Sequence, residues 1–139
     1  MRPAGRKSAA NPQKRRSQPG EPRRAIEFHH QALVVLRKIG DRRSEGNVLG
    51  NLGTAYAVLS EPRRAIECYE QHLAIAREIG DRRGEGRALA NLGRAYGDLG
   101  DSQRASACYT QSLAIGREIG DPRIVEACER GLKHLAAGA

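Results

Sequence analysis

The stretch GEGRALANLGRAYGDLG, residues 84–100, decides the fold that we predict for this 139-residue chain. Its large apolar residues recur at steps of three and four, which is the spacing of one face of an α-helix. They are Leu89, Leu92 and Tyr96. Gly93 removes a side chain from that face, so a second helix can approach closely there. The stretch therefore predicts an amphipathic helix paired with another helix.

A polar line runs along the same predicted helix. Arg87, Asn91 and Arg94 are four and three residues apart, so their side chains share a face that differs from the apolar one. Two interpretations stay open for this line. It is either a surface that binds a partner, or a solvated helix face on which Asn side chains tie one helix to its neighbour.

The stretch belongs to an internal repeat of 40 residues. Residues 41–80 and 81–120 align without a gap and are identical at 24 of 40 positions. Residues 21–40 match the second half of this unit, and residues 121–139 stand where a further first half belongs. The predicted order is a half unit, two whole units and a weak terminal half.

Each whole unit is predicted to form two helices. Asp41 is placed to accept hydrogen bonds from free backbone N–H groups at the start of the first helix. Pro62 suits the start of the second helix, and Gly80 supplies the left-handed residue that ends it. We expect no strand, and we expect helices at residues 22–39, 42–58, 62–79, 82–98, 102–119 and 122–136.

The motifs NLGTAY with AIECYEQHL, and NLGRAY with ASACYTQSL, resemble the tetratricopeptide repeat. The positions of that family's pattern are filled in one unit by Leu49, Leu52, Gly53, Tyr56, Ala65, Tyr69 and Leu73, and in the next by Leu89, Leu92, Gly93, Tyr96, Ala105, Tyr109 and Leu113. The usual repeat of the family has 34 residues. The longer unit here is more similar to the 40-residue variant of the Partner-of-Inscuteable family and of bacterial multidomain regulators, whose units run GDRxxEGRAxxNLGxAY.

This resemblance covers about residues 21–136 and implies an all-α fold, a right-handed α-solenoid of antiparallel helix pairs. We expect the repeat domain to occupy residues 21–139. Its last half has Lys133 where the family pattern has Gly and Ala136 where it has Tyr, so we expect residues 121–139 to be a terminal cap.

The resemblance also implies a function. In a stacked repeat, the polar side of successive first helices lines a concave groove. We therefore expect a protein–protein interaction scaffold that binds a protein or peptide ligand in this groove. The expected peptide-binding residues are Asn47, Asn51, Thr54, Arg87, Asn91, Arg94 and Asp98.

The first 20 residues differ in composition from the repeats. Residues 1–20 contain six basic side chains, no acidic ones and three prolines, so six of the eight net positive charges of the chain lie in this segment. Such a composition predicts a disordered, solvated tail. An alternative is weak attachment to nucleic acid, without base stacking because the tail has no aromatic residue.

The tail stands where the first helix of the first unit belongs. Pro12 and Pro19 occupy the positions of apolar residues in the later units, so a regular helix is not expected there. The helix at residues 22–39 would then lack its hairpin partner and expose an apolar surface that includes Ile26, Leu33 and Leu36. We expect self-association through this helix as an alternative function, or a chain that is a fragment of a longer array.

No catalytic, metal or cofactor pattern is present. Cys68, Cys108 and Cys128 have no CxxC spacing and are odd in number, so we expect packing residues rather than a disulfide framework or a zinc site. His29 and His30 are adjacent, and neighbouring residues point about 100° apart on a helix. We therefore expect no enzyme, no cofactor and no bound metal.

The sequence also lacks membrane and secretion signals. No apolar run approaches the length of about 18 residues that a spanning helix needs, and Arg2 and Pro3 stand where a signal peptide would be apolar. We expect a cytoplasmic protein that makes no membrane contact.

Overall fold

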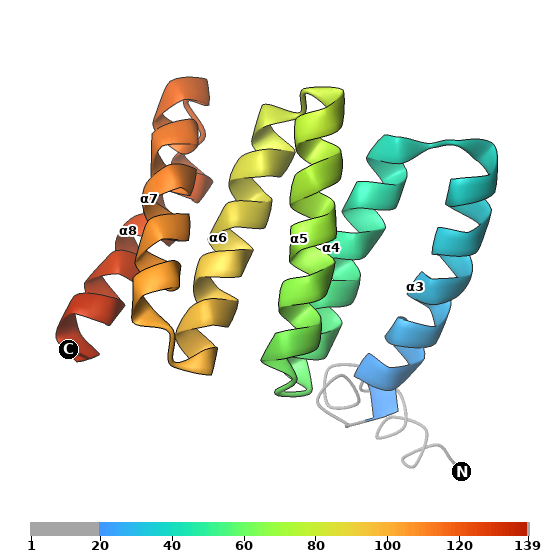
Figure 1. Ribbon diagram of the computed structural model, residues 1–139, viewed down its shortest axis with the longest axis horizontal. Coiled ribbons are helices and arrows are strands. Elements are labelled where there is room, and N and C mark those ends of the chain that lie inside the picture. The colour runs from blue at the N-terminus through green and yellow to red at the C-terminus, as the bar shows by residue number, and fades with distance from the viewer. Residues whose placement is uncertain (1–19, 139) are drawn as a thin grey trace, which may run out of the picture.

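The computed structural model describes residues 20–138, and the predicted disordered tail, apart from its last residue, lies outside this range. This part of the chain is an all-α solenoid of antiparallel helix pairs, with no strand (Figure 1). Its six helices are α3 (Gly20–Ile39), α4 (Arg42–Val58), α5 (Pro62–Ile79), α6 (Arg82–Leu99), α7 (Ser102–Ile119) and α8 (Pro122–Gly138). The predicted helix bounds are confirmed to within two residues. The first helix begins at Gly20 rather than at residue 22.

The helices begin and end where local chemistry predicts. The carboxylates of Asp41 and Asp81 accept hydrogen bonds from the backbone N–H groups of Ser44 and Gly84, at 3.1 and 2.9 Å. Gly80 ends α5 with a φ of 72°, a left-handed conformation that glycine adopts without steric cost. The turn after α4 is different, because Ser60 takes a φ of 60° there.

The helices form two rows, with α3, α5 and α7 in one and α4, α6 and α8 in the other (Figure 1). Each helix packs against the next in sequence, and α6 also contacts α4 and α8. One apolar cluster joins α3, α4, α5 and α6, and a second joins α7 and α8 to α6. Because both clusters include side chains of α6, the core runs along the whole solenoid.

Tyrosine rings fill the space that glycines leave between paired helices. A β-carbon placed on Gly53 would lie 2.6 Å from Cε1 of Tyr69, and one on Gly93 would lie 2.8 Å from Cδ1 of Tyr109. The ring of Tyr109 also covers Gly131 of α8. The close approach predicted at these glycines is therefore an approach of helix backbone to an aromatic ring.

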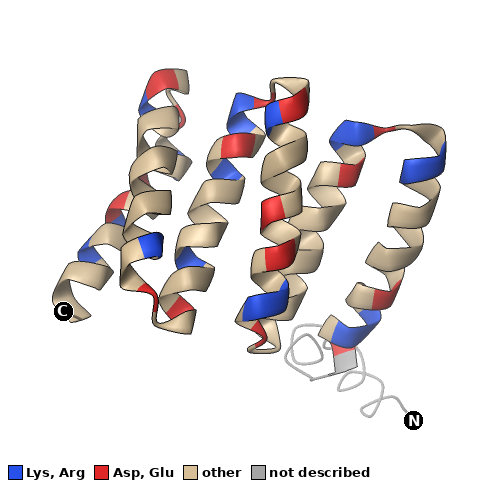
Figure 2. Cartoon of the chain, viewed as in Figure 1, with Lys and Arg blue, Asp and Glu red and all other residues tan. Residues whose placement is uncertain are grey.

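A ladder of ion pairs repeats every 40 residues near the turns that precede α4 and α6 (Figure 2). Arg42 bonds Glu45 of its own helix and Glu78 of α5, with Nε 3.0 Å from Oε2 of Glu78. Arg82 makes the equivalent bonds to Glu85 and Glu118. The bonds to these arginines lower the pKa of the Glu78 and Glu118 carboxyls, although both pairs are exposed to solvent.

The predicted apolar surface of the first helix is wrong in its residues. Leu33 is only 3% exposed, and Ile26 and Leu36 are partly buried, because this side of α3 packs on α4. Another side carries the exposed apolar residues Phe28, Val35 and Ile39, and Val34 is exposed separately from them. The helix has two apolar sides, and only the one that meets α4 is covered within residues 20–138.

Candidate functional site

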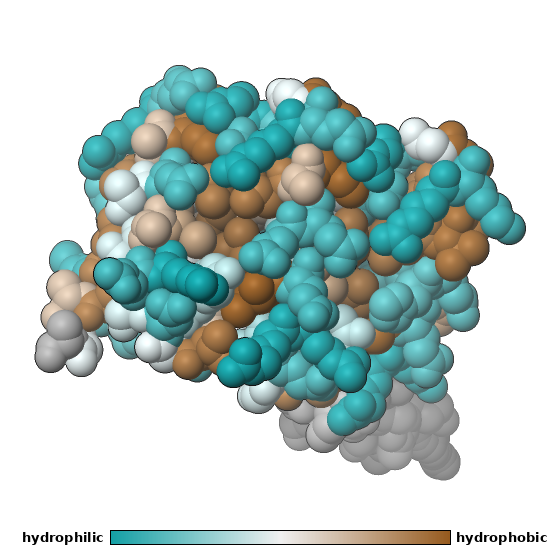
Figure 3. All heavy atoms as spheres, in the orientation of Figure 1, coloured by the Kyte–Doolittle hydropathy of each residue, from teal (hydrophilic) through white to brown (hydrophobic). Residues whose placement is uncertain are grey.

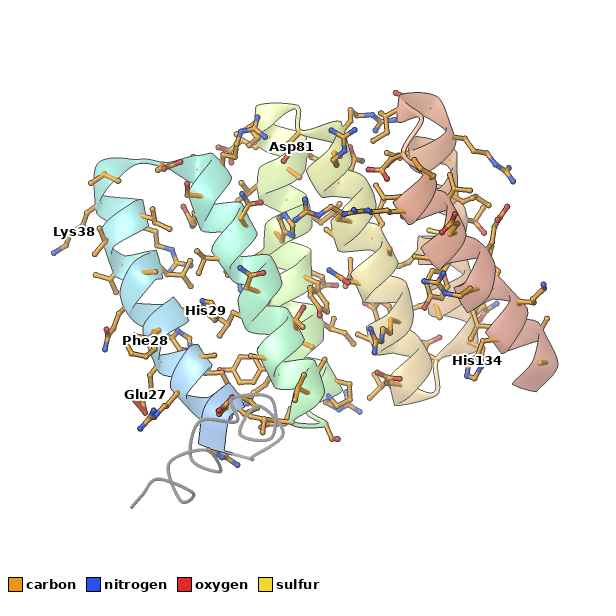
Figure 4. The ribbon with its side chains drawn as sticks, turned by 180° about the vertical axis from the view of Figure 1, so that it is seen from behind. Glu27, Phe28, His29, Lys38, Asp81 and His134 are labelled. Atoms are coloured by element: carbon orange, nitrogen blue, oxygen red, sulfur yellow. The ribbon has the colours of Figure 1, made fainter. Side chains whose placement is uncertain are left out.

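The polar sides of α4, α6 and α8, which lie side by side, form the surface that we call the groove face (Figure 4). Three hollows follow one another along this face, and the hollows share side chains of α6. Asn91 is partly buried and lines all three of them. It is the centre of the candidate site.

The α6–α8 hollow has a volume of about 550 Å³. Arg94 and Asp98 line it from α6, and Arg130 and His134 line it from α8. Tyr109 of α7 lies at its base, and burial raises the pKa of this phenol. The hollow therefore combines an aromatic surface with two guanidinium groups and one carboxylate.

The turn hollow, of about 790 Å³, lies where α7 is followed by α8. Arg87 and Arg123 line it, together with Arg83 and Asp121. Arg83 is paired with Asp121, its Nε 2.9 Å from Oδ2, and this bond is the main reason why the pKa of Asp121 is lowered. Asp121 also caps α8 through the backbone N–H of Arg123.

The α4–α6 hollow is smaller, at about 120 Å³. Thr54 lines it together with Tyr69, and their hydroxyl oxygens are 3.0 Å apart. The Thr54 hydroxyl also donates to the carbonyl of Gly50 at 3.1 Å. Burial raises the pKa of Tyr69, while the Thr54 bond and the charge of Arg94 oppose that rise. Thr54 is thus already bonded within the protein.

Basic charge predominates on the part of the groove face between α6 and α8. Within residues 20–138, four of the arginines that line these hollows form no ion pair. They are Arg87, Arg94, Arg123 and Arg130. Asp121 is engaged by Arg83, which leaves Asp98 as the acidic side chain that faces them. An anionic ligand would meet donors that the protein does not use elsewhere.

The seven predicted groove residues fall into two groups. The hollows bring together five of them, namely Thr54, Arg87, Asn91, Arg94 and Asp98. Asn47 and Asn51 are exposed on α4 and line none of the three hollows. In the described part of the chain, no side-chain hydrogen bond joins Asn47, Asn51 or Asn91 to another helix.

Sequence reasoning missed Arg83, Arg123 and Arg130. Arg83 and Arg123 occupy equivalent positions 40 residues apart, so the repeat itself was a usable signal. Arg130 stands where the two whole units have Gly50 and Ala90, and nothing in the repeat pattern marks it as a groove residue.

The cysteines and histidines lie apart from this site. Burial raises the pKa of the Cys68 thiol to about 11, and Cys128 is fully covered, as expected of packing residues. His29 is partly buried with a pKa lowered chiefly by desolvation, and Nε2 of the exposed His30 lies 3.4 Å from the Tyr56 hydroxyl. Among residues 20–138, no group of three His, Cys, Asp or Glu side chains is placed to hold a metal ion.

Comparison with known proteins gives the family. The tetratricopeptide repeat family matches residues 20–78 and, in a second register, residues 45–118. The chain belongs to this family. Tetratricopeptide repeats generally mediate protein–protein interaction, and proteins built from them are typically scaffolds rather than enzymes. No curated protein matches the chain.

One similar solved structure is the crystal structure of BtubC (BKLC) from P. vanneervenii. The two chains are 20% identical and superpose with a TM-score of 0.62 over 86% of this tetratricopeptide repeat protein. The match covers 58% of the BtubC chain, so the present chain spans less than two thirds of its length. At this identity the likeness shows the fold alone.

No helix within residues 20–138 is long and apolar enough to cross a bilayer.

Proposed function

We propose that this tetratricopeptide repeat domain holds an extended, acidic peptide segment of a partner protein along the groove face, chiefly between α6 and α8. The observation that carries the proposal is the position of Asn91 at the centre of three adjoining hollows, with unpaired arginines on both sides. The proposed site keeps Thr54, Arg87, Asn91, Arg94 and Asp98, and adds Arg123 and Arg130.

The shape of the surface supports an extended peptide as the ligand. The hollows adjoin through shared residues, so together they make a strip along α6 rather than one deep cavity. An asparagine side chain offers both a donor and an acceptor, which matches the alternating N–H and C=O groups of an extended backbone. Asn91 is partly buried and bonds no other side chain of residues 20–138, so its amide is available for such pairing.

The charge of the surface supports an acidic ligand. Guanidinium groups bind carboxylates in a bidentate way, and Arg87, Arg94 and Arg130 surround Asn91 without carboxylate partners of their own. Asp98 at the far end of the α6–α8 hollow would favour a basic or neutral residue there. The proposed ligand therefore carries its acidic residues opposite the middle and first turns of α6.

Asn47 and Asn51 would extend the site onto α4. They occupy the positions of Arg87 and Asn91 one repeat earlier, and both are exposed. The resemblance of the 40-residue unit to Partner-of-Inscuteable repeats supports a groove ligand in general, whereas the arginines of this chain give the ligand its acidic character. Contacts on α4 would thus lengthen the binding site without adding to its preference for acidic peptides.

The test is selection of peptides from a random library against the whole chain, followed by titration of the selected peptides by fluorescence anisotropy. We expect acidic sequences to be enriched and Arg87→Ala with Arg94→Ala to weaken their binding by about tenfold or more. Arg63→Ala is the matched control, because Arg63 is exposed on α5 in the other row. Equal losses in the control and the groove variants would contradict the proposal.

A further inference from the structure

The side of α3 that faces away from α4 carries an apolar stripe that we call the outer face. It consists of Phe28, Ala32, Val35 and Ile39, spaced by four, three and four residues. Phe28 is 66% exposed, Val35 55% and Ile39 67%. In Figure 4, Phe28 points away from the other helices while His29 lies toward α4, and hydrophobic residues reach the surface at this edge in Figure 3. Such a stripe along one helix marks a contact surface.

The two internal repeats show what covers this face. Forty residues later the stripe becomes Cys68, His72, Ile75 and Ile79 on α5. Cys68, His72 and Ile75 are each less than one tenth exposed. They are covered by α4, whose glycines provide the space. A β-carbon on Gly46 would lie 3.3 Å from Cγ2 of Ile75, and one on Gly50 would lie 2.9 Å from Nδ1 of His72. The outer face of α3 is therefore the docking surface for a helix that resembles α4.

One charge on the outer face is reversed relative to the internal repeats. Glu78 and Glu118 pair with Arg42 and Arg82 of the covering helices. The residue at the same position of α3 is Lys38, which is exposed and points outward (Figure 4). Arg24 adds a second exposed positive charge along the same edge. A covering helix with arginine in the usual place would meet Lys38 as a like charge.

Within residues 20–138, α8 does not match the outer face of a second copy. On α8, the positions of Arg42, Gly46, Gly50 and Gly53 are held by Pro122, Glu126, Arg130 and Lys133. A second copy docked through α8 would thus bury charged side chains against the apolar stripe.

A second copy docked through its own α3 would bring together two edges that each carry two positive charges, Arg24 and Lys38, against one negative charge, Glu27, so a net repulsion would remain. Residues 1–19 contain six basic side chains and no acidic one, so they cannot provide a carboxylate opposite Lys38.

We propose that the outer face of α3 docks an amphipathic helix of a separate partner protein, one that has small residues along its contact side and a carboxylate opposite Lys38. The small residues leave room for Phe28 and Val35, as Gly46 and Gly50 of α4 leave room for Ile75 and His72 of α5. The carboxylate stands where α4 and α6 have Arg42 and Arg82. It therefore favours binding of the partner helix over binding of α4 or α6 from another copy. This surface is independent of the groove face.

Two synthetic peptides test the proposal on the whole chain. One has the sequence of residues 41–58, and the other is the same peptide with Arg42→Glu. We expect the Glu peptide to bind about tenfold more tightly than the Arg peptide, because an attractive pair with Lys38 replaces a repulsive one. Lys38→Glu in the chain should reverse that preference, and Val35→Glu should abolish binding of both peptides. Lys133→Glu, the matched charge change on α8, should alter neither affinity.

The same experiments can also overturn the proposal. Equal affinities of the two peptides, or a preference that Lys38→Glu leaves unchanged, would overturn the assignment of an acidic partner helix. Sedimentation without peptide tests the second copy, and a dimer that Val35→Glu dissociates would show that self-association occupies the face instead. Circular dichroism should be used to check that each variant is folded, and Val35 is exposed enough for its replacement to leave the core intact. Asn91→Ala should leave binding of both peptides unchanged, which separates this face from the groove.

Discussion

At the scale of single residues, the packing of Tyr109 depends on the absence of side chains around it. Its ring lies against Gly93 of α6 and Gly131 of α8. Replacing Gly93 by Leu should push the ring away and lower the free energy of unfolding by about 1–3 kcal/mol, as overpacked cores do. Urea unfolding followed by circular dichroism measures the change.

Gly97, one turn further along α6, is the control for this prediction. A β-carbon there would lie 3.9 Å from Cδ2 of Leu135, which is an ordinary contact. Gly97→Ala should therefore stabilise the protein by about 0.5–1 kcal/mol, because alanine favours the helical backbone more than glycine does. A Gly93→Leu variant as stable as the parent would contradict the prediction, because it would show that α6 and α7 can move apart at Gly93 with no loss of unfolding free energy.

A second prediction concerns His72, which is buried between α5 and α4 with no hydrogen-bond partner for Nδ1. Burial lowers its pKa below the ordinary value of 6.5, the nearby Arg87 lowers it further, and Asp81 opposes this. The unfolded chain therefore binds the proton more tightly than the folded chain does. The free energy of unfolding should fall as the pH drops below about 6.5.

The variant His72→Ser tests this dependence, because Ser112 occupies the equivalent position and donates to the carbonyl of Gly86 at 2.6 Å. Urea unfolding at about pH 7.5 and pH 5 should show a smaller loss of stability in the variant than in the parent. His29 also has a lowered pKa, so a remaining part of the dependence is expected. An identical loss in both proteins would mean that His72 is not the group that responds.

At the scale of helices, the bounds of each helix could be predicted from the sequence because residues at or next to the helix ends determine where the helix begins and ends. An aspartate such as Asp41 meets backbone donors three residues away, and a glycine such as Gly80 ends a helix by its own conformation. The covered side of α3 was mispredicted for the opposite reason. Leu33 and Val35 are both apolar, and only the position of α4 decides which of the two is buried.

The candidate site was predictable where polar residues follow a line along one helix, and not at the turn between α7 and α8 or in the terminal half unit. Asn91 and Arg94 were found because they continue a line along one helix. Arg130 was missed because it lies in the terminal half unit, where the position of Gly50 and Ala90 holds a charged residue. Asn47 and Asn51 follow the same line as Arg87 and Asn91, yet the hollows form on the α6 and α8 side.

The turns between helices offer a third prediction. Ser60 and Gly100 occupy equivalent positions with φ of 60° and 90°, a region that disfavours residues with a β-carbon. Gly100→Ser should lower the free energy of unfolding by about 1 kcal/mol. Ser60→Gly should raise it by less, since glycine loses more backbone entropy on folding. Thermal unfolding of the two variants checks both signs, and two unchanged midpoints would contradict the argument.

At the scale of the whole molecule, positive charge is divided between residues 1–20 and the groove face. The repeats themselves carry nearly balanced charge, so an acidic peptide that binds the groove should sense the local arginines. Arg87→Ala should weaken binding and also reduce its dependence on salt. Asn91→Ala should weaken binding by about 1–3 kcal/mol, because a polar group of the bound peptide would lose its hydrogen-bond partner. The salt dependence should stay unchanged, because that loss involves no charge.

Stability must be followed in the same variants. If the asparagines only tie helices together, Asn51→Ala and Asn91→Ala would lower the melting temperature, and affinity would change only as far as folding does. We expect the reverse, with stability nearly constant in Asn91→Ala and the larger loss of affinity at Asn91 than at Asn51. A loss of stability without a loss of intrinsic affinity would leave the polar line as a structural feature.

The central claim is that the groove face between α6 and α8 binds an acidic peptide. Its most direct test is an NMR titration of the whole isotope-labelled chain with an acidic peptide selected from a random library. We predict that chemical-shift changes concentrate on Arg87, Asn91, Arg94 and Arg130 and disappear in high salt. Shifts confined to α3, or to the exposed sides of α5 and α7, would contradict the claim.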